Sequence, residues 1–179
     1  MAFNIADITI RPLAETDSIE ELTELLHRGY KVLADMGLNY MASYQDADRT
    51  RKRISYGECF VVVHDNRIIG TINFYMPEAV GGSPWLNRED VCEFGQFTVE
   101  PEYQGHGIGG MMVKFVEDLA RSRGIAEICL NTSDKAFHLI DWYQRLGYRF
   151  IEHVDWKPTN YLSVILSKSL STPNSGEPE

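Results

Sequence analysis

Long apolar runs are missing from this sequence, whose longest purely apolar stretches are only a handful of residues. A transmembrane helix needs about 20 such residues, so we expect no membrane partner. The first residues also lack the basic segment followed by an apolar segment that marks a secretory signal. Together these absences predict a cytoplasmic protein.

Positive charge is scarce as well, with 17 Lys and Arg residues against 26 Asp and Glu and a formal net charge of -9. Because nucleic-acid binding depends on basic surface, we expect no nucleic-acid partner. One basic strip, Arg49, Arg51, Lys52 and Arg53, lies in a short charged helix expected at about 46–56. We interpret the strip as a solvent-exposed face, with a role in binding a ligand phosphate as the second interpretation.

Cysteine is rare, and the three residues Cys59, Cys92 and Cys129 show no CxxC spacing. Each lies in an apolar, strand-like segment. This arrangement predicts reduced thiols in the core rather than disulfides or a zinc site, and we expect no metal.

The length of 179 residues fits one domain, which we place at 1–170, followed by a disordered tail rich in Pro, Ser and Glu at 171–179. Apolar periodicity predicts helices at four places: from Asp17 or Ser18 to Gly37, at about 46–56, at 108–124 and at 136–146. Strands are expected at 7–13, 59–63, 68–75, 92–99, 125–131, 148–154 and 161–170. The fold class is therefore α/β (α+β).

A glycine-rich turn, Gly105-His-Gly-Ile-Gly-Gly110, connects the strand at 92–99 to the helix at 108–124. Glycines allow a ligand to approach the backbone, and the first amides of a helix have no intrahelical acceptor, so a phosphate or pyrophosphate is the expected occupant. A Walker A loop is excluded because no Lys-Ser/Thr follows. The literal GxGxxG match keeps a nucleotide-binding oxidoreductase as a third hypothesis, without an obvious acidic ribose ligand at a strand end.

The register Gln104-x-x-Gly107-x-Gly109 closely resembles the acetyl-CoA pyrophosphate loop of the GNAT superfamily of N-acyltransferases. The segment 136–148 resembles a later helix of that family, because Tyr143 precedes Gly147 by four residues. The order of strands and helices expected over 7–170 is also similar to that of the GNAT family. The resemblance implies a GNAT-like mixed, mostly antiparallel central sheet of about seven strands with flanking helices.

It also implies a cofactor site for acetyl-CoA, used as co-substrate. The main chain of Phe97, Thr98 and Val99 would pair with the pantetheine arm, and Asn131 would lie where two parallel strands separate. Many relatives carry an asparagine where this chain has Ser133-Asp-Lys135. The pyrophosphate would be held by Gln104, Gly105, His106, Gly107, Ile108, Gly109 and Gly110.

Two residues are candidates for proton transfer. Alternation puts Glu93 on a strand face shared with Gly95, Phe97 and Val99. From this face Glu93 could take the proton of the acceptor amine directly or through a water. The alternative is that Glu93 is a solvent-facing carboxylate at a strand end. Tyr143 matches the family tyrosine that approaches the CoA sulfur as general acid, and it could also be a core aromatic. We set aside His106 and His138 as bases.

The acceptor site is expected to involve Tyr40, Tyr44, Trp85 and Trp156, although the two tyrosines could instead pack a helix pair onto the sheet. We expect an N-acetyltransferase for a small-molecule amine, such as an amino acid-like compound or an antibiotic of the aminoglycoside kind, and the acidic composition favours a cationic acceptor. A protein or peptide acceptor and a non-catalytic acyl-CoA-binding module are the alternatives. The oligomeric state stays open, with a homodimer as one option.

Overall fold

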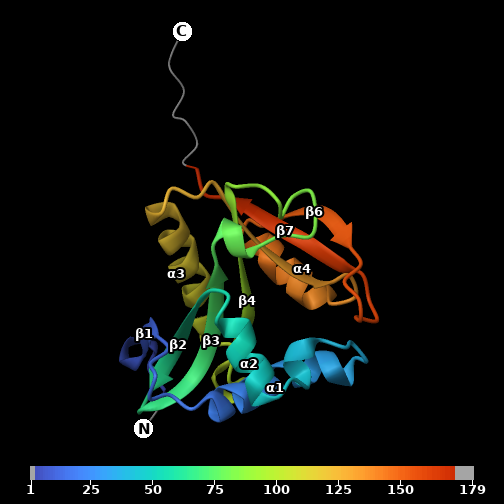
Figure 1. Cartoon of the computed structure of the whole chain (residues 1–179). Helices are drawn as coiled ribbons and strands as arrows, with labels where there is room; N and C mark the ends of the chain where they lie inside the picture. The colour runs from blue at the N-terminus through green and yellow to red at the C-terminus, as the bar shows by residue number, and fades with distance from the viewer. Residues whose placement is uncertain (1–2, 172–179) are drawn as a thin grey trace.

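A seven-stranded sheet runs through the computed structural model, which describes residues 3–171. The strand order is β1-β2-β3-β4-β5-β7-β6 (Figure 1). Apart from its first residue, the tail expected at 171–179 lies outside the described residues. The strands are β1 (Thr9–Pro12), β2 (Glu58–His64), β3 (Arg67–Tyr75), β4 (Val91–Val99), β5 (Glu127–Ser133), β6 (Arg149–Val154) and β7 (Ser163–Ser169).

Of the strand pairs within residues 3–171, only β4 with β5 is parallel, and all the others are antiparallel. The turn between β2 and β3 uses Asp65 and Asn66 with φ values of 47° and 60°, as expected for a tight hairpin. The expected mixed, mostly antiparallel sheet is therefore confirmed, as is the closing hairpin of β6 and β7.

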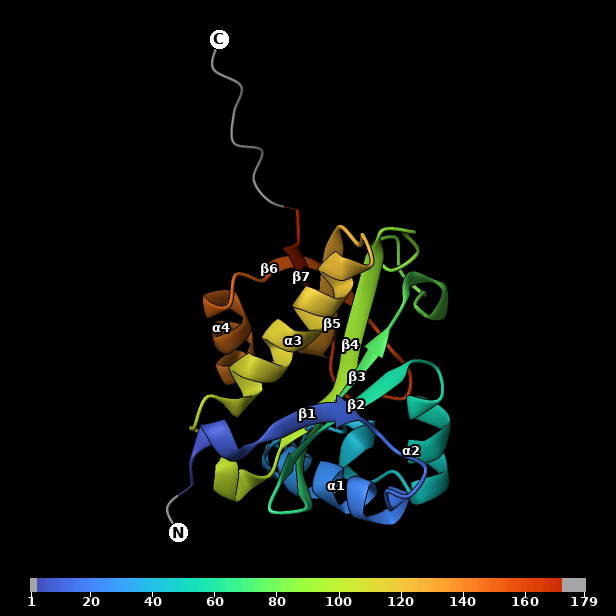
Figure 2. The same ribbon diagram turned by 90° about the vertical axis from the view of Figure 1, so that its left-hand side faces the viewer.

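Helices cover both faces of the sheet: α1 (Ile19–Asp35) and α2 (Ala47–Ile54) lie on one face, and α3 (Ile108–Ser122) and α4 (Phe137–Arg145) on the other (Figure 2). Ser18 and Asp46 begin the first two by accepting backbone N–H groups of Glu21 and Arg49. None of the described helices combines the length and apolar composition of a membrane span. Four short 3₁₀ turns complete the elements: Ile5–Asp7, Met41–Ser43, Pro77–Ala79 and Pro101–Tyr103.

The main apolar core fills the space between the sheet and the α3/α4 layer, where Cys92 and Phe94 of β4 meet Met112 and Val116 of α3. None of the three cysteines forms a disulfide. Burial raises the pKa of the Cys92 thiol to about 12, so this thiol stays protonated and unreactive at neutral pH. Cys129 is buried as well, whereas Cys59 is only partly buried.

A β-bulge in β4 corrects one prediction about the faces of that strand. The register with β3 shifts between Thr71 and Asn73, and Gln96 has a positive φ of 44°. Beyond the bulge the alternation changes phase, because the extra residue turns the following side chains over. Val99 belongs to the α3/α4 core together with Phe94, and Phe97 packs against it. Glu93 therefore does not share a face with Phe97 and Val99, as the sequence pattern suggested.

The other face of β4 packs closely on α1. Thr98 projects toward Gly29, where a Cβ atom would lie 1.7 Å from the Thr98 Oγ1. A glycine is needed at this helix position because any side chain would collide with the strand.

We predict that Gly29→Ala lowers the free energy of unfolding by about 1–3 kcal/mol, because the new methyl group forces α1 away from β4. In an uncrowded helix the same change is stabilising, by up to about 1 kcal/mol. Gly110→Ala, where nothing lies within 4 Å of the added Cβ, is the matched control. Urea unfolding of both variants measures the difference, and an unchanged or raised stability of the Gly29 variant would contradict the packing.

Candidate active site

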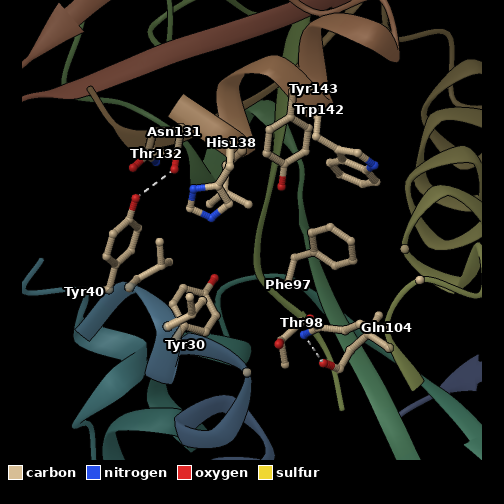
Figure 3. A pocket seen from close by; sticks show the side chains of 17 residues that line it. Tyr30, Tyr40, Phe97, Thr98, Gln104, Asn131, Thr132, His138, Trp142 and Tyr143 are labelled. Atoms are coloured by element: carbon tan, nitrogen blue, oxygen red, sulfur yellow. Dashed lines mark hydrogen bonds between the residues drawn. The ribbon is translucent and has the colours of Figure 1, made fainter. Parts of the chain in front are cut away.

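The two parallel strands in the middle of the sheet separate part of the way along. Their pairing covers Val91 to Glu93 on β4 and Glu127 to Cys129 on β5, and no further pair follows. Beyond this point a cavity of about 440 Å³ lies between the strands, bounded by α1 on one side and α4 on the other (Figure 3). The edge of β4 that faces β5 is unpaired there, so its backbone polar groups are available to a ligand.

Several residues predicted to hold the cofactor line this cavity, and others do not. Glu93 is not in the cavity lining, but its carboxylate accepts a hydrogen bond from Asn131, and Asn131 lines the cavity. His106, Gly107, Ile108 and Gly110 also lie outside the lining. The predicted residues that line the cavity are Phe97, Thr98, Val99, Gln104, Gly105, Gly109, Asn131, Tyr143 and Tyr40.

The glycine loop has the geometry of an anion site. Gly105 and Gly107 adopt left-handed φ values of 81° and 85°, which glycine tolerates best. No side chain caps the start of α3, and the amides from 105 to 110 have no acceptor among the described residues. Because a helix N-terminus favours negative charge, these amides fit a phosphate or pyrophosphate group.

Two side chains of this loop serve its own conformation. His106 packs edge-on against Phe3 of the N-terminal segment, with ring centroids 5.0 Å apart, and its Nδ1 lies 3.0 Å from the carbonyl oxygen of Gln104. The side chain of Ile108 is buried in the main core. Any contact of these two residues with an anion would therefore come from the backbone.

Glu93 lies at the point where the strands separate. The Asn131 Nδ2 group donates a 2.6 Å hydrogen bond to the Glu93 Oε1. Burial raises the pKa of the Glu93 carboxyl to about 7, while the Asn131 hydrogen bond and the positive charge of Arg53 lower it. A carboxyl with a pKa near 7 can both take up and release a proton at physiological pH.

Tyr143 reaches the cavity from α4, and Figure 3 shows its hydroxyl directed into the space between the helices. The residue is 6% exposed, and burial raises its pKa well above the ordinary value. The phenol is therefore protonated at neutral pH and available as a hydrogen-bond or proton donor. Next to it, Trp142 stacks on Phe97 of β4 with ring centroids 6.2 Å apart.

Tyr40 combines the two roles that the sequence left open. Its ring packs between Tyr30 and Tyr161, and its hydroxyl forms a 2.8 Å hydrogen bond with the Thr132 Oγ1 and accepts one from the Ser133 amide. It therefore joins α1 to the end of β5 and also lines the cavity. Tyr44 is 56% exposed and is not in the lining.

Trp85 and Trp156 lie in a separate apolar cluster. Both pack against Leu86, Cys129 and Ile165, and Arg88 lies 4.2 Å over the Trp85 ring. Neither tryptophan lines the cavity. The loop at 76–90 that carries Trp85 is accordingly packed on the far part of the sheet.

Sequence reasoning gave no site role to Tyr30, His138 and Trp142, which line the cavity together with Gly29, Val32, Leu33, Thr132 and Leu139. Tyr30 follows Leu26 by four positions, and Trp142 follows Leu139 by three, so helical spacing could have indicated both. His138 is exposed on α4 and has no such signal. Only the packing of α4 over the gap brings it to the cavity.

Comparison with known proteins identifies a family. The protein-family model described as the acetyltransferase (GNAT) family matches residues 19–148. S-(2-succino)cysteine N-acetyltransferase from Bacillus subtilis (strain 168) is 32% identical over 138 residues, which are 76% of this chain and 81% of that protein. S-alkylcysteine N-acetyltransferase from the same organism is 23% identical over 142 residues, or 76% of each chain.

A solved structure shows the same fold. A GNAT family acetyltransferase from Elizabethkingia anophelis with acetyl-CoA bound superposes with a TM-score of 0.65 and 19% identity. The match covers 91% of this chain and 98% of that protein.

We predict that Asn131→Ala raises the pKa of Glu93 further above about 7, because the hydrogen bond that favours the ionised carboxylate is removed. A ¹³C NMR titration of glutamate-labelled protein measures this shift. Glu58, whose pKa is held low by Arg123, serves as internal control and stays where it is. An unchanged or lowered Glu93 pKa would contradict the assignment.

Proposed function

Because the chain belongs to the acetyltransferase (GNAT) family, we propose that it transfers the acetyl group of acetyl-CoA to a primary amine of a small molecule, by direct attack in a ternary complex. The observation that carries this proposal is Glu93, a carboxyl with a pKa of about 7 at the point where β4 and β5 separate. Bound acetyl-CoA supplies a thioester carbon open to attack by an amine.

The binding residues divide between loop and strand. The free amides at the start of α3 hold the pyrophosphate. The unpaired edge of β4 at Phe97, Thr98 and Val99 forms backbone hydrogen bonds with the pantetheine arm. An amide of this edge polarises the thioester carbonyl, since a fixed N–H dipole stabilises negative charge that develops on the oxygen.

Glu93 takes the proton of the acceptor amine. Because Glu93 stands behind Asn131 and outside the cavity lining, the transfer runs through a bridging water. A base of this kind typically contributes about 10²- to 10⁴-fold to the rate. As the new N–C bond forms and the C–S bond breaks, the amine proton passes to Glu93, and the leaving thiolate takes the phenolic proton of Tyr143.

A small-molecule acceptor suits both the relatives and the cavity. The relatives described above are named for cysteine derivatives, which are small amines. On the acceptor side, the rings of Tyr30, Tyr40 and Tyr161 pack on one another and form a rigid aromatic wall.

We predict that Glu93→Gln lowers kcat/KM for acetyl transfer by about 10²- to 10³-fold at pH 8, because the amide cannot accept the amine proton. In the wild-type enzyme, activity rises with pH through about 7 as Glu93 ionises. This ionisation step is lost in the variant. Release of free thiol from acetyl-CoA measures both effects.

Glu89→Gln is the matched control, because Glu89 is an exposed carboxylate in the loop before β4. Its pH profile and rate should equal those of the wild type. Full activity of the Glu93 variant, or an unchanged pH profile, would remove Glu93 from the mechanism.

For Tyr143→Phe we predict a fall in kcat of about 10- to 100-fold with a KM for acetyl-CoA within about 3-fold of wild type, since only the proton donor is lost. Tyr148→Phe is the matched control, because Tyr148 belongs to the same core cluster as Tyr143. Its hydroxyl donates to the buried Glu117, so its removal lowers the melting temperature but leaves kcat unchanged. Equal kcat values for wild type and the Tyr143 variant would show that another group protonates the sulfur.

A further inference from the structure

One arginine of the basic strip on α2 turns toward the protein interior. Arg49 is exposed, and Arg51 pairs with Asp48 in solvent. Arg53 is half-buried and donates from Nη1 to the Gln45 Oε1 at 2.5 Å. No carboxylate of the described residues forms an ion pair with it. A partly desolvated guanidinium without a counter-ion is unusual, because the lost hydration has to be replaced.

Hydrogen bonds connect this guanidinium to the bulge in β4. Gln45 is buried, and its Nε2 donates to the Gln96 Oε1 at 3.0 Å. Gln96 lies three residues beyond Glu93 on the same strand. Arg53 is therefore held by the sheet face that carries Glu93.

The charge of Arg53 acts on groups from four separate elements. Burial raises the pKa of Tyr30 on α1, Tyr75 on β3, Glu93 on β4 and Tyr161 in the loop between β6 and β7, and the positive charge of Arg53 opposes each of these shifts. These elements enclose the acceptor side of the gap between the strands. The half-buried guanidinium lies outside the lining of the cavity of about 440 Å³, on the side of the sheet that carries Glu93, and its charge reaches both the base and the aromatic wall.

Unpartnered polar atoms mark the same face. Asn73 is fully buried, and neither its side-chain nitrogen nor its oxygen has a well-formed hydrogen bond among the described residues; the same holds for the Gln96 Nε2. Both side chains face the Tyr75 hydroxyl and partly offset the rise that burial causes in its pKa. The register sets Asn73 opposite Gly95, and Tyr75 opposite Glu93. Buried polar groups are normally paired, so this face keeps hydrogen-bonding capacity beside Arg53 that a polar ligand can use.

We propose that Arg53 binds a carboxylate of the acceptor, so that the acceptor is an amino acid whose carboxylate lies close to the reacting amine. A guanidinium matches a carboxylate with two parallel hydrogen bonds, and binding it there points the amine at Glu93. Arg53 is the one cation of the described residues that affects the pKa of Glu93, and a single positive charge suits a carboxylate better than a phosphate dianion. This inference rests on the proposed function, and it departs from the cationic acceptor that the acidic composition favoured.

The test compares acceptors that differ only in the carboxylate. Methionine, S-methylcysteine, leucine and phenylalanine are each assayed beside their methyl ester and their decarboxylated amine, with acetyl-CoA and free-thiol detection. At pH 8.5 Glu93 is ionised in the wild type. We expect the best free amino acid to exceed its decarboxylated amine by about 10- to 100-fold in kcat/KM, as for one charge-assisted contact.

The variants separate carboxylate binding from a structural effect. Arg53→Gln should lower kcat/KM for the free acid by about 10- to 100-fold, mainly through KM, and change the ester and the amine by less than about 3-fold. Because each acceptor is compared with itself across variants, differences in amine pKa cancel. Arg53→Lys keeps the positive charge, and its kcat/KM for the free acid should lie between the values of the wild type and Arg53→Gln. If Arg53→Gln does not fold, the lysine variant still tests the inference. Arg49→Gln, on the exposed side of α2, should match the wild type.

Equal losses for all three acceptor types in Arg53→Gln, or a wild-type preference for the decarboxylated amines, would overturn the inference. Acetylation of glucosamine 6-phosphate in preference to every amino acid would assign the site to phosphate instead. If no amine releases thiol, the proposed function fails, and calorimetry of S-methylcysteine on the CoA-saturated protein decides the inference separately. Binding to wild type that Arg53→Gln loses supports it, and equal or undetectable binding to both rejects it.

Discussion

The separation of β4 from β5 is the constraint on which the rest of this site depends. The pair is hydrogen-bonded only from Val91 to Glu93, while the outer neighbours β3 and β7 stay paired with them farther along. The bulge at Gln96 lies just beyond the last parallel pair, and a bulge bends its strand and increases the local twist. The result is a gap in a continuous sheet, with a free backbone edge that a thioester-bearing chain can complete.

Glu93 gains its chemistry from this position at the end of the pairing. Burial raises its pKa from the ordinary 4.5 to about 7, against the opposing effects of Asn131 and Arg53. Because the folded pKa lies above the unfolded one, the stabilising contribution of the protonated form is present below about pH 4.5 and is lost as pH rises through about 7. The ionised carboxylate therefore lowers the stability of the fold near neutral pH.

Much of the fold follows from local patterns. The stripes of α1 and α3, the Ser18 cap and the Asp65-Asn66 turn all appear where the sequence predicts them, because period, capping and turn chemistry depend on neighbouring residues. The face of Glu93 was predicted wrongly, since a single bulge reverses the alternation after it. Arg53 looked like part of a solvated strip, and helical spacing alone does not show which side of α2 meets the sheet.

The sequence by itself determined the order of elements and placed a glycine-rich turn at the start of a helix, because these depend on residue types at short spacing. Strand alternation made Glu93 a candidate, and the resemblance to the GNAT family made Tyr143 one. The tertiary structure decided where the strands separate, which residues line the cavity, and that Tyr40 joins α1 to β5. It also decided the pKa of Glu93 and the inward direction of Arg53. These properties arise from burial and charge contributed by segments far apart in the chain, and no local pattern encodes them.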